Sequence, residues 1–63
     1  LRMSVGDLVI LKEYAGESDI SLFGMGIVLV RSWNDDGFWE SLVWFENIEE
    51  CVMCDDVDLQ LIA

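Results

Sequence analysis

Apolar residues along the chain fall into short runs that are broken about every ten positions by glycine, asparagine or acidic residues. The runs are rich in valine, isoleucine and aromatic residues, and none keeps a convincing helical period. This pattern is typical of β-strands joined by turns. We expect five strands, at residues 7–14, 24–33, 38–45, 50–54 and 58–62. The sequence therefore predicts an all-β chain that forms a single domain over residues 4–63.

The hairpin between the second and third expected strands has the strongest local signal. Residues 34–37 read Asn-Asp-Asp-Gly, and an Asp-Gly pair between two β-rich runs predicts a turn with positive φ at its centre. The glycine at the start of residues 24–33 predicts a bulge or a sharp bend there. We therefore expect these two strands to lie side by side.

The other connections are a long loop and one short helical turn. Residues 15–23 carry glycine, serine and acids with few apolar residues, so we expect a loop that is anchored by Ile20 and Phe23. Residues 55–57 are expected to form one turn of tight helix before the last strand. A helix within residues 46–57 is an alternative, because three of its apolar positions fit a single helical turn.

The third expected strand is apolar on both faces. Leu42 and Trp44 point to one side of a strand, and Val43 and Phe45 point to the other. A single small domain encloses only one of these pairs. We expect the other pair to be covered by a second copy of the chain, through a two-fold contact.

Four segments resemble those of small β-barrels. Residues 5–9 (Val-Gly-Asp-Leu-Val) and 24–28 (Gly-Met-Gly-Ile-Val) resemble the glycine-aspartate entry and the G-x-G-[IV]-V second strand of KOW-type SH3-like barrels. Residues 42–45 and 56–62 resemble segments of the small uncharacterised barrel proteins that are found in tailed phages and marine viral sequences. The resemblance covers residues 4–62. It implies a five-stranded SH3-like small barrel with one short helical turn before the last strand.

The resemblance does not fix a function, because SH3-like barrels serve ribosomal, chromatin, transcription and adaptor roles. KOW-type barrels often bind RNA or polymerase through basic loops. In this chain the expected loops are acidic, with Glu17, Asp19, Asp35, Asp36, Glu46 and Glu49. RNA binding of the KOW kind is therefore not expected.

The acids are unevenly distributed along the chain. Residues 1–31 carry four acids and three bases, a sum of −1, and residues 32–63 carry nine acids and no base, a sum of −9. Nucleic-acid affinity comes largely from lysine and arginine, so we expect no direct nucleic-acid partner. The acids either keep an apolar chain in solution or face a basic partner. One alternative is a decoy that imitates nucleic acid and occupies a DNA- or RNA-binding protein.

Neither a metal, a cofactor nor an enzyme active site is expected. Cys51 and Cys54 have C-x-x-C spacing, but without a second pair or a histidine a zinc site would need two chains. Residues three apart on a strand face opposite sides, so we expect two reduced thiols that act as small apolar fillers. The paired acids at 35–36 and 55–58 lack the spacing of a calcium loop. No nucleophile with an adjacent base is recognisable.

Reduced cysteines fit a cytoplasmic protein, or the host cytoplasm if the protein is viral. No apolar run approaches the roughly 20 residues that a membrane span needs. No signal peptide is recognisable, and Leu1 and Arg2 before Met3 are expected to be a remnant of recombinant expression.

Aromatic residues, some of them needed for the core, supply the candidate interaction surface. Grooves that bind proline-rich basic peptides combine aromatic side chains with acids, and Tyr14 and Trp39 beside an acidic loop would supply both. The candidate surface consists of Trp33, Trp39, Trp44, Phe45, Glu17 and Asp19. We therefore predict a small, acidic, non-enzymatic protein–protein interaction module of phage or environmental origin, which works as a homo-oligomer or an adaptor.

Overall fold

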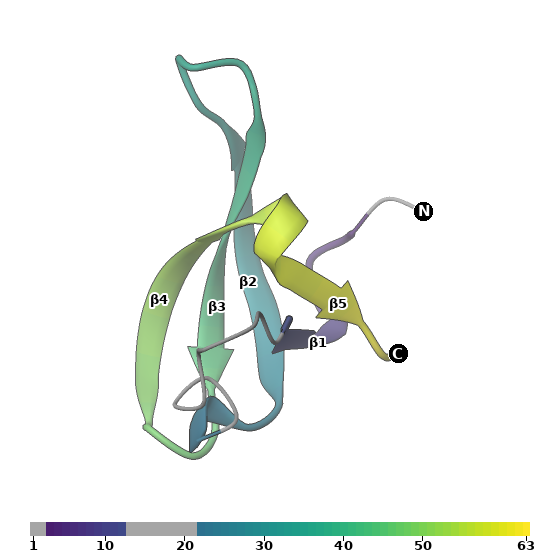
Figure 1. Cartoon of the computed structure of the whole chain (residues 1–63), viewed down its shortest axis with the longest axis vertical. Coiled ribbons are helices and arrows are strands. Elements are labelled where there is room, and N and C mark those ends of the chain that lie inside the picture. The colour runs from purple at the N-terminus through teal and green to yellow at the C-terminus, as the bar shows by residue number, and fades with distance from the viewer. Residues whose placement is uncertain (1–2, 13–21) are drawn as a thin grey trace.

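The computed structural model describes residues 3–12 and 22–63. In these residues five strands, with the 3-10 turn η2 before the last of them, follow one another in the predicted order (Figure 1). They are β1 (Leu8–Leu11), β2 (Gly26–Trp33), β3 (Trp39–Phe45), β4 (Glu50–Asp55), η2 (Asp56–Asp58) and β5 (Leu59–Leu61). The all-β prediction is confirmed, and residues 46–57 form a turn, β4 and the start of η2 instead of a longer helix.

All five strands belong to one antiparallel sheet with the order β4-β3-β2-β1-β5. The strands β4 and β5 are its edges, and the sheet is not closed. In Figure 1, β2, β3 and β4 run along the long direction of the molecule, whereas β5 runs at a steep angle to them. The turn η2 makes this change of direction possible, because it redirects the chain between β4 and β5.

The hairpin between β2 and β3 has the predicted turn. The amide of Gly37 donates to the carbonyl of Asn34 at 3.1 Å, and the amide of Asp36 donates to the Asn34 side chain at 2.8 Å. Gly37 has a φ of 91°, which only glycine adopts without strain. The hairpin itself is confirmed, but the prediction of a positive φ at the centre of the turn is wrong, because it lies at the last position, Gly37.

The bend and the bulge of β2 lie at two different places. Gly24 has a φ of 70°, so the expected bend before the strand is present. The bulge lies further along, where the pairing of β2 with β3 shifts between Val28 and Val30 and leaves Leu29 as the extra residue. The bulge shifts the alternation of inward and outward side chains along the second half of β2.

The core lies on one side of the sheet and takes a residue from every strand. Its buried members are Val9, Val28, Val43, Phe45, Cys54 and Leu59. Phe45 is fully buried, pairs with Gly26 across β2 and β3, and meets the ring of Phe23 edge to face with centroids 5.2 Å apart. A Cβ on Gly26 would lie 2.9 Å from the Phe45 ring and 2.5 Å from a methyl group of Val43. Gly26 therefore makes room for the aromatic ring at the centre of the core.

The two faces of β3 differ in burial. Val43 and Phe45 are fully buried, whereas the side chain of Trp44 is 38% exposed. The placement of Phe45 on the candidate surface is therefore wrong, because its ring fills the core opposite a glycine. Phe23 packs on this core as expected.

Several sequence-based predictions lie outside the described residues. They concern Tyr14, Glu17, Asp19 and Ile20, with most of the loop over residues 15–23. Within residues 3–12 and 22–63, no helix has the length and apolar character that crossing a membrane requires.

Candidate interaction surfaces

The aromatic residues of the predicted surface divide between the two sides of the sheet. Trp33 and Trp39 pair across β2 and β3 at inward positions, beyond the end of the core. Trp44 alternates with the buried Val43 and Phe45, so it points to the opposite side. The structure therefore brings two of the predicted residues together and separates the third from them.

On the side of Trp44, the three long strands present an uncharged surface. Paired residues of neighbouring strands lie on the same face, and the register aligns two rows across β2, β3 and β4. We call these six residues the outer face: Ile27, Trp44 and Cys51 in one row, and Val30, Leu42 and Met53 in the other. Exposure is 51% at Val30 and 52% at Met53, so large apolar side chains on this face remain in water.

Charged residues flank the outer face without interrupting it. The next outward row along the same strands consists of Ser32, Glu40 and Asp55, and it carries two carboxylates. Beyond the other end of β3 stands the exposed Glu46. The acidic residues are thus at the rim of an apolar patch, which is the arrangement found in protein–protein interfaces.

On the inner side, Arg31 forms a polar network that closes one end of the core. Its guanidinium makes an ion pair with Asp56 of η2, donates to the backbone carbonyl of Met3, and donates through Nε to the hydroxyl of Ser41 at 3.2 Å. The Ser41 hydroxyl donates to the other Asp56 oxygen at 3.3 Å. The guanidinium carbon also lies 4.9 Å from the centroid of the Trp39 ring. Arg31 thereby ties β2, β3, η2 and the N-terminal segment together.

Sequence reasoning missed this network. A single arginine in an apolar strand usually points to solvent, whereas the side chain of Arg31 is only 10% exposed. The one signal for it in the sequence is the position of Arg31 two residues before Trp33, on the same side of the strand. Strict alternation from the buried Val28 would place Arg31 on the outer side of the strand, and the bulge at Leu29 reverses this.

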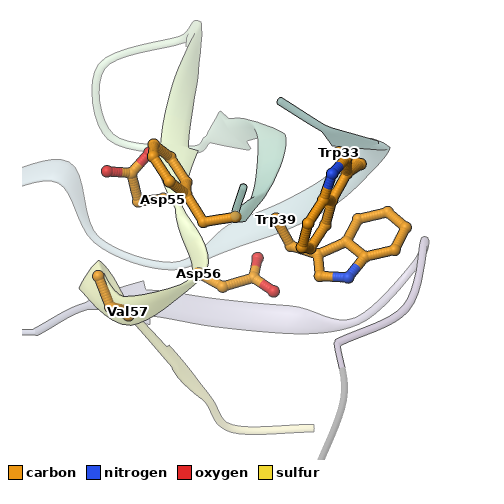
Figure 2. Close-up of a pocket in the computed structure, with 6 residues that line it drawn as sticks. Trp33, Trp39, Asp55, Asp56 and Val57 are labelled. Carbon is orange, nitrogen blue, oxygen red and sulfur yellow. The ribbon is translucent and has the colours of Figure 1, made fainter. Parts of the chain in front are cut away.

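The pocket beside this network is lined by aromatic and acidic residues. Its volume is about 420 Å³, and its lining consists of Trp33, Phe38, Trp39, Asp55, Asp56 and Val57. The two indoles meet edge to face with centroids 5.6 Å apart and an interplanar angle of 74°. Figure 2 shows the Asp56 carboxylate directed toward the tryptophans and the Asp55 carboxylate directed away from them. The pocket is therefore an aromatic site between the β2–β3 hairpin and η2 with one carboxylate facing its interior.

The two cysteines lie on opposite faces of β4, as their spacing predicts. Cys54 is 7% exposed and its thiol packs in the core, whereas Cys51 is exposed on the outer face. Burial, and then the charges of Asp58 and Asp55, raises the pKa of the Cys54 thiol to about 11. Both cysteines are free thiols. The prediction of an apolar filler is confirmed for Cys54 and is wrong for Cys51, because the outer face is open to water.

Among the described residues, no group of three or more histidine, cysteine or acidic side chains is arranged to hold a metal ion. Comparison of the chain with models of protein families, with curated proteins and with solved structures gives no match.

Proposed function

We propose that the protein is a small, non-enzymatic protein–protein interaction module that associates with a second copy of itself through the outer face. The observation that carries this proposal is the pair of uncharged rows across β2, β3 and β4, with carboxylates only at the rim. Water-exposed apolar surface of this kind is stabilised when another protein surface covers it.

The fold we propose is an SH3-like small barrel. The antiparallel order β4-β3-β2-β1-β5 and the 3-10 turn before β5 support it, together with the resemblance of residues 5–9 and 24–28 to KOW-type barrels. We propose an adaptor role for the assembled form, and the resemblance favours a phage or environmental origin.

A second copy fits the outer face because this face carries no charge. Each chain carries −10, so two copies repel each other unless their contact avoids acids. A two-fold contact places the uncharged rows against each other and leaves the acids at the edge. A standard interface takes about 800 Å² from each partner, which is about a fifth of the 4250 Å² surface of this chain.

Sedimentation equilibrium at tens of micromolar tests the proposal. We expect a dimer that becomes tighter as salt rises, because salt screens the repulsion between acidic chains while the apolar contact remains. Trp44→Glu places a charge at the centre of the outer face and should give a folded monomer. Val5→Glu is the matched control, since Val5 is 63% exposed and is not part of the outer face.

Two results would overturn this proposal. One is an unmodified chain that stays monomeric at low and high salt, and the other is equal dissociation of Trp44→Glu and Val5→Glu. An acidic decoy would show the opposite salt dependence to the dimer, because its complex with a basic nucleic-acid-binding protein weakens with added salt.

A further inference from the structure

We propose that the pocket between the β2–β3 hairpin and η2 binds the guanidinium group of an arginine side chain from a basic partner. The pocket has a volume of about 420 Å³, which lies within the range of roughly 300–1,000 Å³ that is typical of ligand sites. Trp33 and Trp39 line it from inward positions of the sheet. The site is therefore separate from the outer face, and its ligand does not depend on self-association.

The aromatic walls favour a cation with a flat, apolar surface. Trp33 is 58% exposed and Phe38 is 38% exposed, so both rings are accessible to a ligand. The face of an aromatic ring carries negative partial charge and attracts cations, and tryptophan does so most strongly. The edge-to-face contact of Trp33 with Trp39 holds the two indoles in place before any ligand arrives.

The charges around the pocket also select a cation. The carboxylate of Asp56 faces the pocket, where its ion pair with Arg31 offsets its charge, and Asp55 adds a second negative charge at the pocket wall, although its carboxylate is directed away from the tryptophans. The hairpin turn adds the exposed Asp35 and Asp36. Residues 32–63 contain nine acids and no base, so this part of the chain attracts a cationic ligand, and the positive charge of Arg31 beside the pocket is offset by Asp56.

Arg31 shows how a guanidinium is recognised at this place. It lies over the Trp39 ring and binds the Asp56 carboxylate at the same time. An incoming arginine would make the same combination with Trp33 and Asp56, whose carboxylate oxygens each have room for a further hydrogen bond. Arginine suits this arrangement better than lysine, because the planar guanidinium is weakly hydrated and stacks on aromatic rings. Its aliphatic stem would contact Val57.

Nuclear magnetic resonance of the full chain tests the proposal with three short peptides that differ only at the central residue. The peptides carry arginine, lysine, or citrulline, which has nearly the shape of arginine without its charge. We expect the arginine peptide to shift the indole N–H signals of Trp33 and Trp39 and to leave that of Trp44 in place. The citrulline peptide should bind at least about tenfold more weakly and the lysine peptide several-fold more weakly.

Two variants locate the site. Trp33→Leu should weaken binding of the arginine peptide about tenfold, whereas Trp44→Leu, on the other side of the sheet, should leave it unchanged. Equal binding of arginine and citrulline would overturn the proposal, as would an unchanged affinity in Trp33→Leu. Shifts confined to Trp44 would assign the peptide to the outer face instead. None of these outcomes alters the sedimentation test of self-association.

Discussion

Replacement of Arg31 by methionine is expected to destabilise the fold strongly, although the residue is a single charge in a small acidic protein. The change keeps most of the aliphatic stem and removes the guanidinium. It deletes the ion pair with Asp56 and the hydrogen bonds to the Met3 carbonyl and the Ser41 hydroxyl. It also removes the cation from above the Trp39 ring.

The expected loss follows from burial. Breaking a buried ion pair by removal of one partner costs about 3–5 kcal/mol. The side chain of Asp56 is 29% exposed, so water replaces part of what it loses, and we expect about 2–3 kcal/mol. A chain of 63 residues has a total stability of about 3–9 kcal/mol, at about 0.05–0.15 kcal/mol per residue. The variant should therefore lose a large fraction of its stability.

Urea unfolding followed by tryptophan fluorescence measures this loss. With a slope near 1 kcal/mol/M, the midpoint should fall by about 2 M or more. Lys12→Met is the matched control, because it removes the same charge from an exposed position and should change stability by less than about 0.5 kcal/mol. Equal midpoints for Arg31→Met and Lys12→Met at the same protein concentration would refute the structural role of the network.

Three further predictions concern the core, the thiols and nucleic acids. Gly26→Ala should lower the midpoint of urea unfolding by the equivalent of about 1–3 kcal/mol, because the new methyl group meets a Val43 methyl group and the Phe45 ring. Phe45→Leu relieves the contact with the ring, so it should cost less stability in the Gly26→Ala chain than it does alone, and additive losses would contradict this. In dilute native protein at pH 8, a thiol reagent should modify Cys51 and leave Cys54 unmodified until the protein unfolds, because burial raises the pKa of Cys54 to about 11. Equal rates of modification of Cys51 and Cys54 would contradict the placement of the two thiols. Anisotropy titration with duplex DNA or RNA at near-physiological salt should show no binding, given the charge of −10, and a salt-sensitive micromolar complex would contradict it.

The positions of the strands and turns along the chain were predictable because each rests on local sequence. The apolar runs of β2 and β3 and the glycine of the 34–37 turn are signals that depend only on a few neighbouring residues. The helical turn before β5 was predicted within one residue. Alternation along β3 predicted that Trp44 and Phe45 point to opposite sides, and burial then identified Phe45 as the inward residue.

The parts that could not be predicted depend on contacts between distant residues. Arg31 and Asp56 are 25 positions apart, and they meet only because η2 brings the end of β4 over β2. The bulge at Leu29 is invisible to a strict alternation of inward and outward positions. The sequence does not identify Phe38 as a surface residue, because the pocket that it lines forms between the β2–β3 hairpin and η2, which are distant in the sequence.

The most direct test of self-association through the outer face is the rate at which a thiol reagent modifies Cys51, measured over a range of protein concentrations. Cys51 lies in the same row of the outer face as Trp44, so a contact across that face covers its thiol. We predict that modification slows as the concentration of the unmodified protein rises, and that Trp44→Glu keeps the fast rate at every concentration. A rate for Cys51 that does not change with concentration, in a protein that sediments as a dimer, would show that the copies meet elsewhere and would contradict the assignment of the outer face.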